Sequence, residues 1–254
     1  KTLEEPPADV VLVLLGRTRE SVLPTIVSRC QVVPFRFIPP AEAAGIIAQN
    51  SGASPELSRV ALAACDGSIT RAVEFLRSNE RRAFRTRVLE VLACLRSADD
   101  WDLLGFAGEL LALAKAPLDV VRAEQEQELA DNADFLAKSA IRQIEARNKR
   151  RLTAKTLESL RQLAAIARSW LRDVAAVCAE APELVINTDA LAGIREAAAS
   201  TDEARVAAAL AAVRRCDEAI SYNVAPETCV DALLIEVRDL LYEATSPALA
   251  RGSR

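Results

Sequence analysis

Arg29 is the residue whose type and setting best suit chemistry on a charged ligand. It lies in the segment LPTIVSRCQ, residues 23–31, between Ser28 and Cys30, and apolar runs precede and follow this segment. A guanidinium stays charged and presents a planar fork of donors that matches a phosphate or a carboxylate. The sequence contains no histidine and no glycine-rich phosphate loop that could act beside it. Arg29 is therefore either an ordinary solvated charge, which base rates favour, or half of a site completed by another molecule.

A second group of cations lies between residues 142 and 172, where nine Arg and Lys residues are accompanied by two Glu. Its densest part, which we expect to be a loop or helix junction, holds Arg147, Lys149, Arg150 and Arg151. These four are candidates for a contact with DNA phosphates or with an acidic partner. The alternative is a solvated face balanced by the acidic stretch 124–134. We favour the alternative, because no aromatic residues that could stack on bases interleave the cations.

Composition argues against several other kinds of site. The six cysteines are scattered, no two form a Cys-x-x-Cys pair, and there is no histidine, so no metal site is expected. The cysteines fit helical patterns and are expected to be buried thiols of a cytoplasmic protein. The net charge of −4 does not fit a wholly basic nucleic-acid binder. No apolar run approaches the ~20 residues of a membrane span, so no membrane partner is expected.

Two short apolar segments near the start of the chain are predicted to be strands. Residues 10–15 read VVLVLL and end at Gly16, which is typical of a strand buried on both faces of a parallel sheet. Residues 31–37 suggest a second strand, which Pro34 places at a sheet edge. Two strands cannot make a covered sheet. We therefore expect them to be the end of a larger α/β domain whose first part precedes Lys1.

Helical patterns fill the rest of the chain. Three short helices are expected from Pro40 onward, with Ser54 and Ser68 as N-caps for the second and third. Apolar residues then recur at helical spacing over 155–178, 203–220 and 227–243. The fold class is thus mainly α, with divisions at 1–37, 38–97 and 98–254. In residues 98–254, the apolar stripes of the helices are wide enough to form a helical bundle or a contact between subunits.

The N-terminal motifs resemble the AAA+ clamp-loader subunits of bacterial DNA replication. The segment LEEPP at residues 3–7, the predicted strand and Ser28-Arg29-Cys30 follow one another at the spacing of that family. The resemblance implies that residues 1–37 end an AAA+ α/β domain, 38–97 form a helical lid and 98–254 form an oligomerisation collar. It also implies that Arg29 is an arginine finger donated in trans. ATP and Mg would then be bound by neighbouring subunits and no cofactor by this chain.

Two positions depart from the pattern of the family's hydrolysing subunits. Gly16 occupies the position at the strand end where those subunits carry a polar residue, often Thr, and Thr18 could replace it only with a shifted loop. The family's hydrolysing subunits also carry a Gly-Ser-x-Arg motif in the lid. In Gly67-Ser68-Ile69-Thr70-Arg71, Thr70 stands at the position of that arginine. Arg71 follows one residue later, about 100° around a helix. The resemblance therefore implies a subunit that hydrolyses no ATP itself.

The later segments WLRD at 170–173, Asn187-x-Asp189 and YNVAP at 222–226 resemble the collar of the delta-prime class. Trp170 is expected in the core, and Arg172 and Asp173 are expected in an ion pair or a subunit contact. The implied partners are the gamma/tau and delta subunits through the collar, and the sliding clamp and primed DNA through the whole complex. The chain would be part of the DNA polymerase III holoenzyme, with no catalysis of its own. An ATP-hydrolysing gamma/tau subunit and an unrelated helical adaptor remain alternatives.

Overall fold

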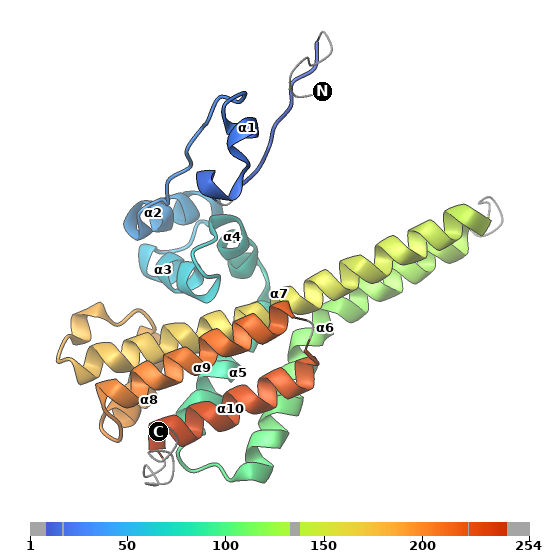
Figure 1. The fold of residues 1–254 in the computed structure, drawn as a ribbon. Helices are drawn as coiled ribbons and strands as arrows, with labels where there is room; N and C mark the ends of the chain where they lie inside the picture. Colours follow the sequence, from blue (N-terminus) through green and yellow to red (C-terminus); the bar gives the residue numbers. More distant parts are fainter. Residues whose placement is uncertain (1–8, 17, 133–137, 223, 243–254) are drawn as a thin grey trace, which may run out of the picture. The chain divides into compact units, whose positions relative to one another are not determined.

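The computed structural model describes residues 9–16, 18–132, 138–222 and 224–242 (Figure 1). The chain divides into two units, residues 1–39 and 40–254, and each is described by itself. Within the described ranges, no helix is both long and apolar enough to cross a membrane. Residues 1–8, which include the LEEPP motif, and the tail from residue 243 onward lie outside the described residues.

In its described residues, 9–16 and 18–39, the first unit contains two short helical segments, and the rest of this part is not helical. They are the 3-10 helix η1 (Arg19–Ser21) and helix α1 (Pro24–Val27). The predicted strands are wrong for the described residues: neither 10–15 nor 31–37 is a strand. A strand exists only when a neighbour pairs with its backbone groups, and the two segments do not pair with each other. Their apolar side chains are correspondingly exposed, with Val11 at 88% and Leu15 at 91%.

The second unit starts with the three predicted short helices. They are α2 (Pro40–Ser51), α3 (Pro55–Ala64) and α4 (Ile69–Arg77). Ser54 Oγ accepts from Leu57 N at 3.2 Å and Ser68 Oγ from Arg71 N at 3.5 Å, as the cap signals predict. Between α3 and α4, Asp66 and Gly67 both have positive φ, of 52° and 78°. Gly67 thus takes the left-handed turn at the helix end that its lack of a Cβ permits.

Helix α5 (Asn79–Cys94) leads into two long helices that run side by side, α6 (Asp100–Asn132) and α7 (Lys138–Cys178) (Figure 1). The expected loop or junction at 147–151 is wrong, because α7 is continuous through it. Arg and Lys are good helix formers, so the charged run offers no stop signal. The 155–178 apolar stripe is the second half of this longer helix.

Short turns η2 (Pro182–Leu184) and η3 (Thr188–Ala190) then connect α7 to α8 (Leu191–Ala198). The last two predicted helices are confirmed as α9 (Glu203–Ser221) and α10 (Pro226–Tyr242). Helix α9 packs along α7, and α10 packs against both α9 and α6. The apolar stripes read from the sequence therefore meet one another in a bundle.

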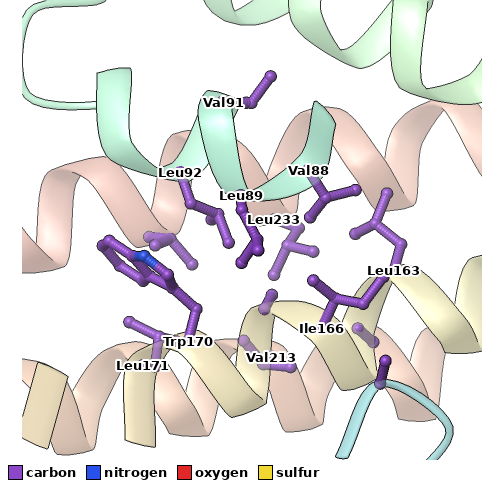
Figure 2. Close-up of a cluster of buried hydrophobic side chains, with 14 of the residues drawn as sticks. Val88, Leu89, Val91, Leu92, Leu163, Ile166, Trp170, Leu171, Val213 and Leu233 are labelled. Carbon is purple, nitrogen blue, oxygen red and sulfur yellow. The ribbon is translucent and has the colours of Figure 1, made fainter. Parts of the chain in front are cut away.

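The core of this bundle is built from α5, α7, α9 and α10. In Figure 2, Leu92 of α5 and Trp170 of α7 lie in one cluster with Val213 of α9 and Leu233 of α10. Trp170 is fully buried, which confirms its predicted place in the core. Burial of such a side chain stabilises the fold by about 1.5–3 kcal/mol. The mainly α class is confirmed, and the further division of residues 38–254 into lid and collar stays a prediction.

Candidate functional site

Arg29 lies exposed just beyond the C-terminal end of α1. Its Nη1 donates a hydrogen bond to Thr25 O at 2.9 Å, and Ser28 Oγ donates to the same carbonyl oxygen at 3.1 Å. Both bonds use one carbonyl group of the kind that a helix end leaves without an intrahelical partner. Cys30 is exposed and its thiol is free. The tripeptide Ser28-Arg29-Cys30 is thus presented on the outside of a short helical turn.

The first degenerate sensor position, Gly16, lies in the extended chain before η1. A Cβ added there would come within 2.8 Å of Val22 Cγ2, so the site is sterically restricted to Gly in this conformation. Thr18, the residue considered as its substitute, caps η1 instead. Its Oγ1 accepts from Ser21 N at 3.2 Å, while Ser21 Oγ accepts from Thr18 N at 3.3 Å. The hydroxyl of Thr18 therefore has a local structural use.

The second degenerate position, Thr70, is exposed in the first turn of α4, and Arg71 beside it is half-buried. Neighbouring residues on a helix point about 100° apart, so the two side chains occupy different faces. Arg29 and Gly16 belong to the first unit and Thr70 to the second. Because the units are described separately, these sequence-predicted positions are not brought into one described site.

The basic run on α7 is exposed at all four candidate positions, Arg147, Lys149, Arg150 and Arg151. In the part of the chain that the structure describes, none of the four has an ion-pair partner. Asn148, within the run, is 7% exposed and turns inward, and its Nδ2 finds no hydrogen-bond partner among the described atoms. The run therefore presents its cations to solvent on the outside of a continuous helix.

A buried polar network was missed by the sequence analysis. Arg85 of α5 is 5% exposed and holds the Asp189 carboxylate with two hydrogen bonds of 2.6 and 2.9 Å. Its Nη2 also donates to Asn187 Oδ1 at 2.7 Å. These bonds from Arg85 lower the pKa of Asp189, against the opposing effect of burial. The Asn187-x-Asp189 segment was the only signal, and it gives no hint of a partner about 100 residues away.

Asp173 belongs to the same network and corrects one expectation. It is fully buried, and its Oδ2 accepts from Asn187 N at 2.7 Å, Asn187 Nδ2 at 2.8 Å and Ile186 N at 3.1 Å. The predicted ion pair of Arg172 with Asp173 is therefore wrong, since Arg172 is exposed on another face of α7. Asp173 instead fixes the loop before η3 to α7.

The cysteines are structural rather than reactive where they are buried. Burial raises the pKa of the Cys65 and Cys216 thiols to about 12, so neither is a thiolate at neutral pH. Cys229 is also buried, whereas Cys94 is exposed like Cys30, so the expectation of burial is correct for only part of the set. Across the described ranges, no group of three or more potential ligands could hold a metal ion.

Comparison with known protein families indicates the class of protein that the first unit resembles. A family model described as DNA polymerase III, delta subunit, matches residues 1–39. The match contains the whole of the first unit and therefore Ser28-Arg29-Cys30.

One curated protein with a similar sequence is the DNA polymerase III subunit delta' of Bacillus subtilis (strain 168). It is 33% identical to this chain over 95 residues, which are 37% of the chain and 28% of the relative. The chain thus aligns with less than a third of the length of that relative. Together, the two matches confirm the resemblance to clamp-loader subunits of the delta-prime type. They also weigh against an accidental likeness to an unrelated adaptor, although the two predicted strands are not formed.

Proposed function

We propose that this chain is a delta-prime-type subunit of a bacterial sliding-clamp loader, acting in DNA replication in the cytoplasm. The observation that carries the proposal is the family match over residues 1–39, in which Arg29 stands exposed at the end of α1. The subunit would take part in loading the sliding clamp onto primed DNA, as one member of a multi-subunit complex. The proposed role is that of a complete delta-prime subunit, whereas the match covers 28% of the length of the Bacillus subtilis relative.

In this proposal, Arg29 is an arginine finger for ATP bound to a neighbouring subunit. A guanidinium placed against the γ-phosphate stabilises the charge that spreads over the transferred group. The hydrogen bond from Nη1 to Thr25 O supports the role, because it restrains the side chain on the outside of α1. ATP and Mg would be held by the neighbour.

The chain itself would hydrolyse no ATP. Gly16 offers no side chain to sense a phosphate, and a larger residue there would collide with Val22. Thr70 provides only a hydroxyl where the family's hydrolysing subunits carry a guanidinium. The helical second unit would then serve assembly, contacting gamma/tau and delta subunits through its C-terminal helices. The solvated face was favoured from the sequence, but Arg147, Lys149, Arg150 and Arg151 are exposed without an ion-pair partner among the described residues. This supports a contact of these cations with DNA or an acidic partner instead.

The test is Arg29→Ala in a loader reconstituted with the other subunits. We expect the total ATPase rate of the loader to fall by the fraction that is contributed by the one ATP site that Arg29 serves. At that site the loss should be large, because a finger contributes a factor on the order of 10³ or more to the rate. Loader assembly, followed by gel filtration, should be unchanged, since Arg29 is exposed.

Arg36→Ala is the matched control, because Arg36 is another exposed arginine of the first unit. It should leave the ATPase rate at the wild-type value. An Arg29→Ala loader that assembles and hydrolyses ATP at the full rate would remove the finger from the proposal. ATP hydrolysis by the chain alone would instead favour the gamma/tau alternative.

A further inference from the structure

A cavity of about 250 Å³ lies between α3 and α7, within the second unit. Apolar side chains from three segments line it: Leu62 and Ala63 of α3, Ala165 of α7, and Ile186 of the loop before η3. Apolar pockets with a few polar groups at their edge are the usual form of a binding site. None of the residues discussed above for the ATP or DNA contacts belongs to this cavity.

Three arginines line the same cavity, and they differ in how their charges are compensated. Arg168 Nη1 donates to Asp66 Oδ1 at 2.7 Å, and Arg168 Nη2 donates to Asp217. Two carboxylates therefore already balance this guanidinium. Asp66 itself lines the cavity, and its carboxylate pairs with Arg168 rather than with either of the other two arginines.

Arg59 of α3 and Arg172 of α7 are the remaining two. Both are exposed, and neither forms an ion pair in the part of the chain that the structure describes. Arg59 has a through-space Coulomb interaction with Glu56, one turn earlier on α3. The cavity therefore combines an apolar floor with two guanidiniums whose hydrogen-bonding forks suit a carboxylate.

Ser169 adds a polar group at the inner wall. It is 7% exposed and its Oγ accepts from Asn187 Nδ2 at 2.9 Å. No acceptor for its hydroxyl hydrogen is found among the described residues, so the hydroxyl can still donate a hydrogen bond to a ligand. The same Asn187 is held by Arg85 and Asp173, which fixes this wall in place.

We propose that this cavity binds an acidic peptide segment of a protein partner. An apolar side chain of the peptide would rest on Leu62 and Ala165, and a neighbouring Asp or Glu carboxylate would bind Arg59 and Arg172. Size supports a peptide: about 250 Å³ is below the roughly 300–1,000 Å³ of small-molecule sites, so it suits one or two side chains.

The lining also favours a peptide over nucleic acid. A DNA backbone offers closely spaced phosphates but no apolar group to cover the floor. The inference uses no residue of the first unit, so it stands or falls separately from the role proposed for Arg29.

The test uses the whole chain, labelled with ¹⁵N, and an N-acetylated, C-amidated peptide of sequence Gly-Ser-Glu-Leu-Ser-Gly. We expect the peptide to shift amide signals of α3 and α7 around the cavity. Arg59→Gln and Arg172→Gln should each weaken binding about tenfold, the loss expected for one charge-assisted hydrogen bond. Arg214→Gln, which changes an exposed arginine of α9, should bind like wild type.

Two altered peptides and two anions complete the experiment. Peptides with Gln in place of Glu, or Ser in place of Leu, should bind at least several-fold more weakly. Equal binding of the Gln peptide, or unchanged affinity in both arginine variants, would overturn the proposal. So would inorganic phosphate or a single-stranded oligonucleotide that shifts the same signals at lower concentration in an Arg59- and Arg172-dependent way.

Discussion

At the scale of single residues, two buried charged side chains, Arg85 and Asp173, meet at Asn187. Arg85 holds Asn187 and Asp189 from one side, and Asp173 holds Asn187 from the other. Removing Arg85 or Asp173, the two buried charged members of this network, would leave a buried charge or dipole without compensation, which typically costs about 3–5 kcal/mol. The loop between α7 and α8 is therefore held by polar contacts rather than by apolar burial alone.

The pH dependence of this network can be tested at Asp189. Its pKa is lowered in the folded protein, so its contribution to stability is present above its unfolded pKa of about 3.9 and is lost as the pH falls through the folded value. We expect Asp189→Asn to cost about 1 kcal/mol at neutral pH, because the carboxylate is half exposed.

The measurement is the melting temperature of both proteins from pH 7 to pH 2. The gap between wild type and Asp189→Asn should narrow below pH ~4, as the wild-type carboxylate takes up a proton. Asp231→Asn on α10 is the control for the removal of a carboxylate elsewhere in the second unit. A constant gap for Asp189→Asn would show that its charge does not contribute.

At the scale of elements, helix packing depends on which positions are small. Gly193 of α8 lies against α5, and a Cβ added there would come within 2.8 Å of Ala93 Cβ. Gly45 of α2 has nothing within 4 Å of such a Cβ. Substitution by Ala would therefore cause a steric clash at Gly193 but would meet open space at Gly45.

We expect Gly193→Ala to destabilise the protein by about 1–3 kcal/mol, through the overpacking of α5 against α8. Gly45→Ala should instead stabilise it by up to about 1 kcal/mol, because Ala has the higher helix propensity. Urea unfolding of both variants measures the difference. Similar effects of the two substitutions would contradict the close approach of α8 to α5.

The exposed cations of α7 provide the second test of an element. We expect that changing Arg147, Lys149, Arg150 and Arg151 together to Gln weakens binding to a fluorescein-labelled primed DNA. It should also lower the salt dependence of the affinity, by about 0.9 in the log–log slope for each phosphate that the variant no longer neutralises. Fluorescence anisotropy at several salt concentrations measures both quantities. If the quadruple variant has the same log–log slope as wild type and as the control Arg214→Gln, these cations do not contact DNA and form a solvated face.

At the scale of the whole molecule, the apolar core of the described residues lies in the second unit. The buried cluster runs from Ala43 to Leu241 and contains none of the described residues of the first unit, 9–16 and 18–39. We therefore expect residues 40–254 to fold without the first unit, with a thermal midpoint within a few degrees of that of the whole chain. Circular dichroism measures this. A non-cooperative transition in residues 40–254 would show that the first unit is needed for the core.

Local signals predicted the helices well where both a cap and an apolar stripe were present. Ser54 and Ser68 marked the starts of α3 and α4, and the stripes located α9 and α10. The strands at 10–15 and 31–37 were wrong, because apolar β-branched composition specifies a strand only when a neighbour pairs with it. The length of α7 was underestimated, since helical propensity continues through its charged run.

The sequence by itself determined the mainly α class, the burial of Trp170 and the likeness to clamp-loader subunits that singles out Arg29. These depend on periodicity and on short motifs, which neighbouring residues carry. Only the tertiary structure decided that Asp173 serves Asn187 rather than Arg172, and that Arg59 and Arg172 share one cavity. Arg59 and Arg172 are more than 100 residues apart in the chain. No local pattern encodes such a pairing, because it arises only when α3 packs against α7.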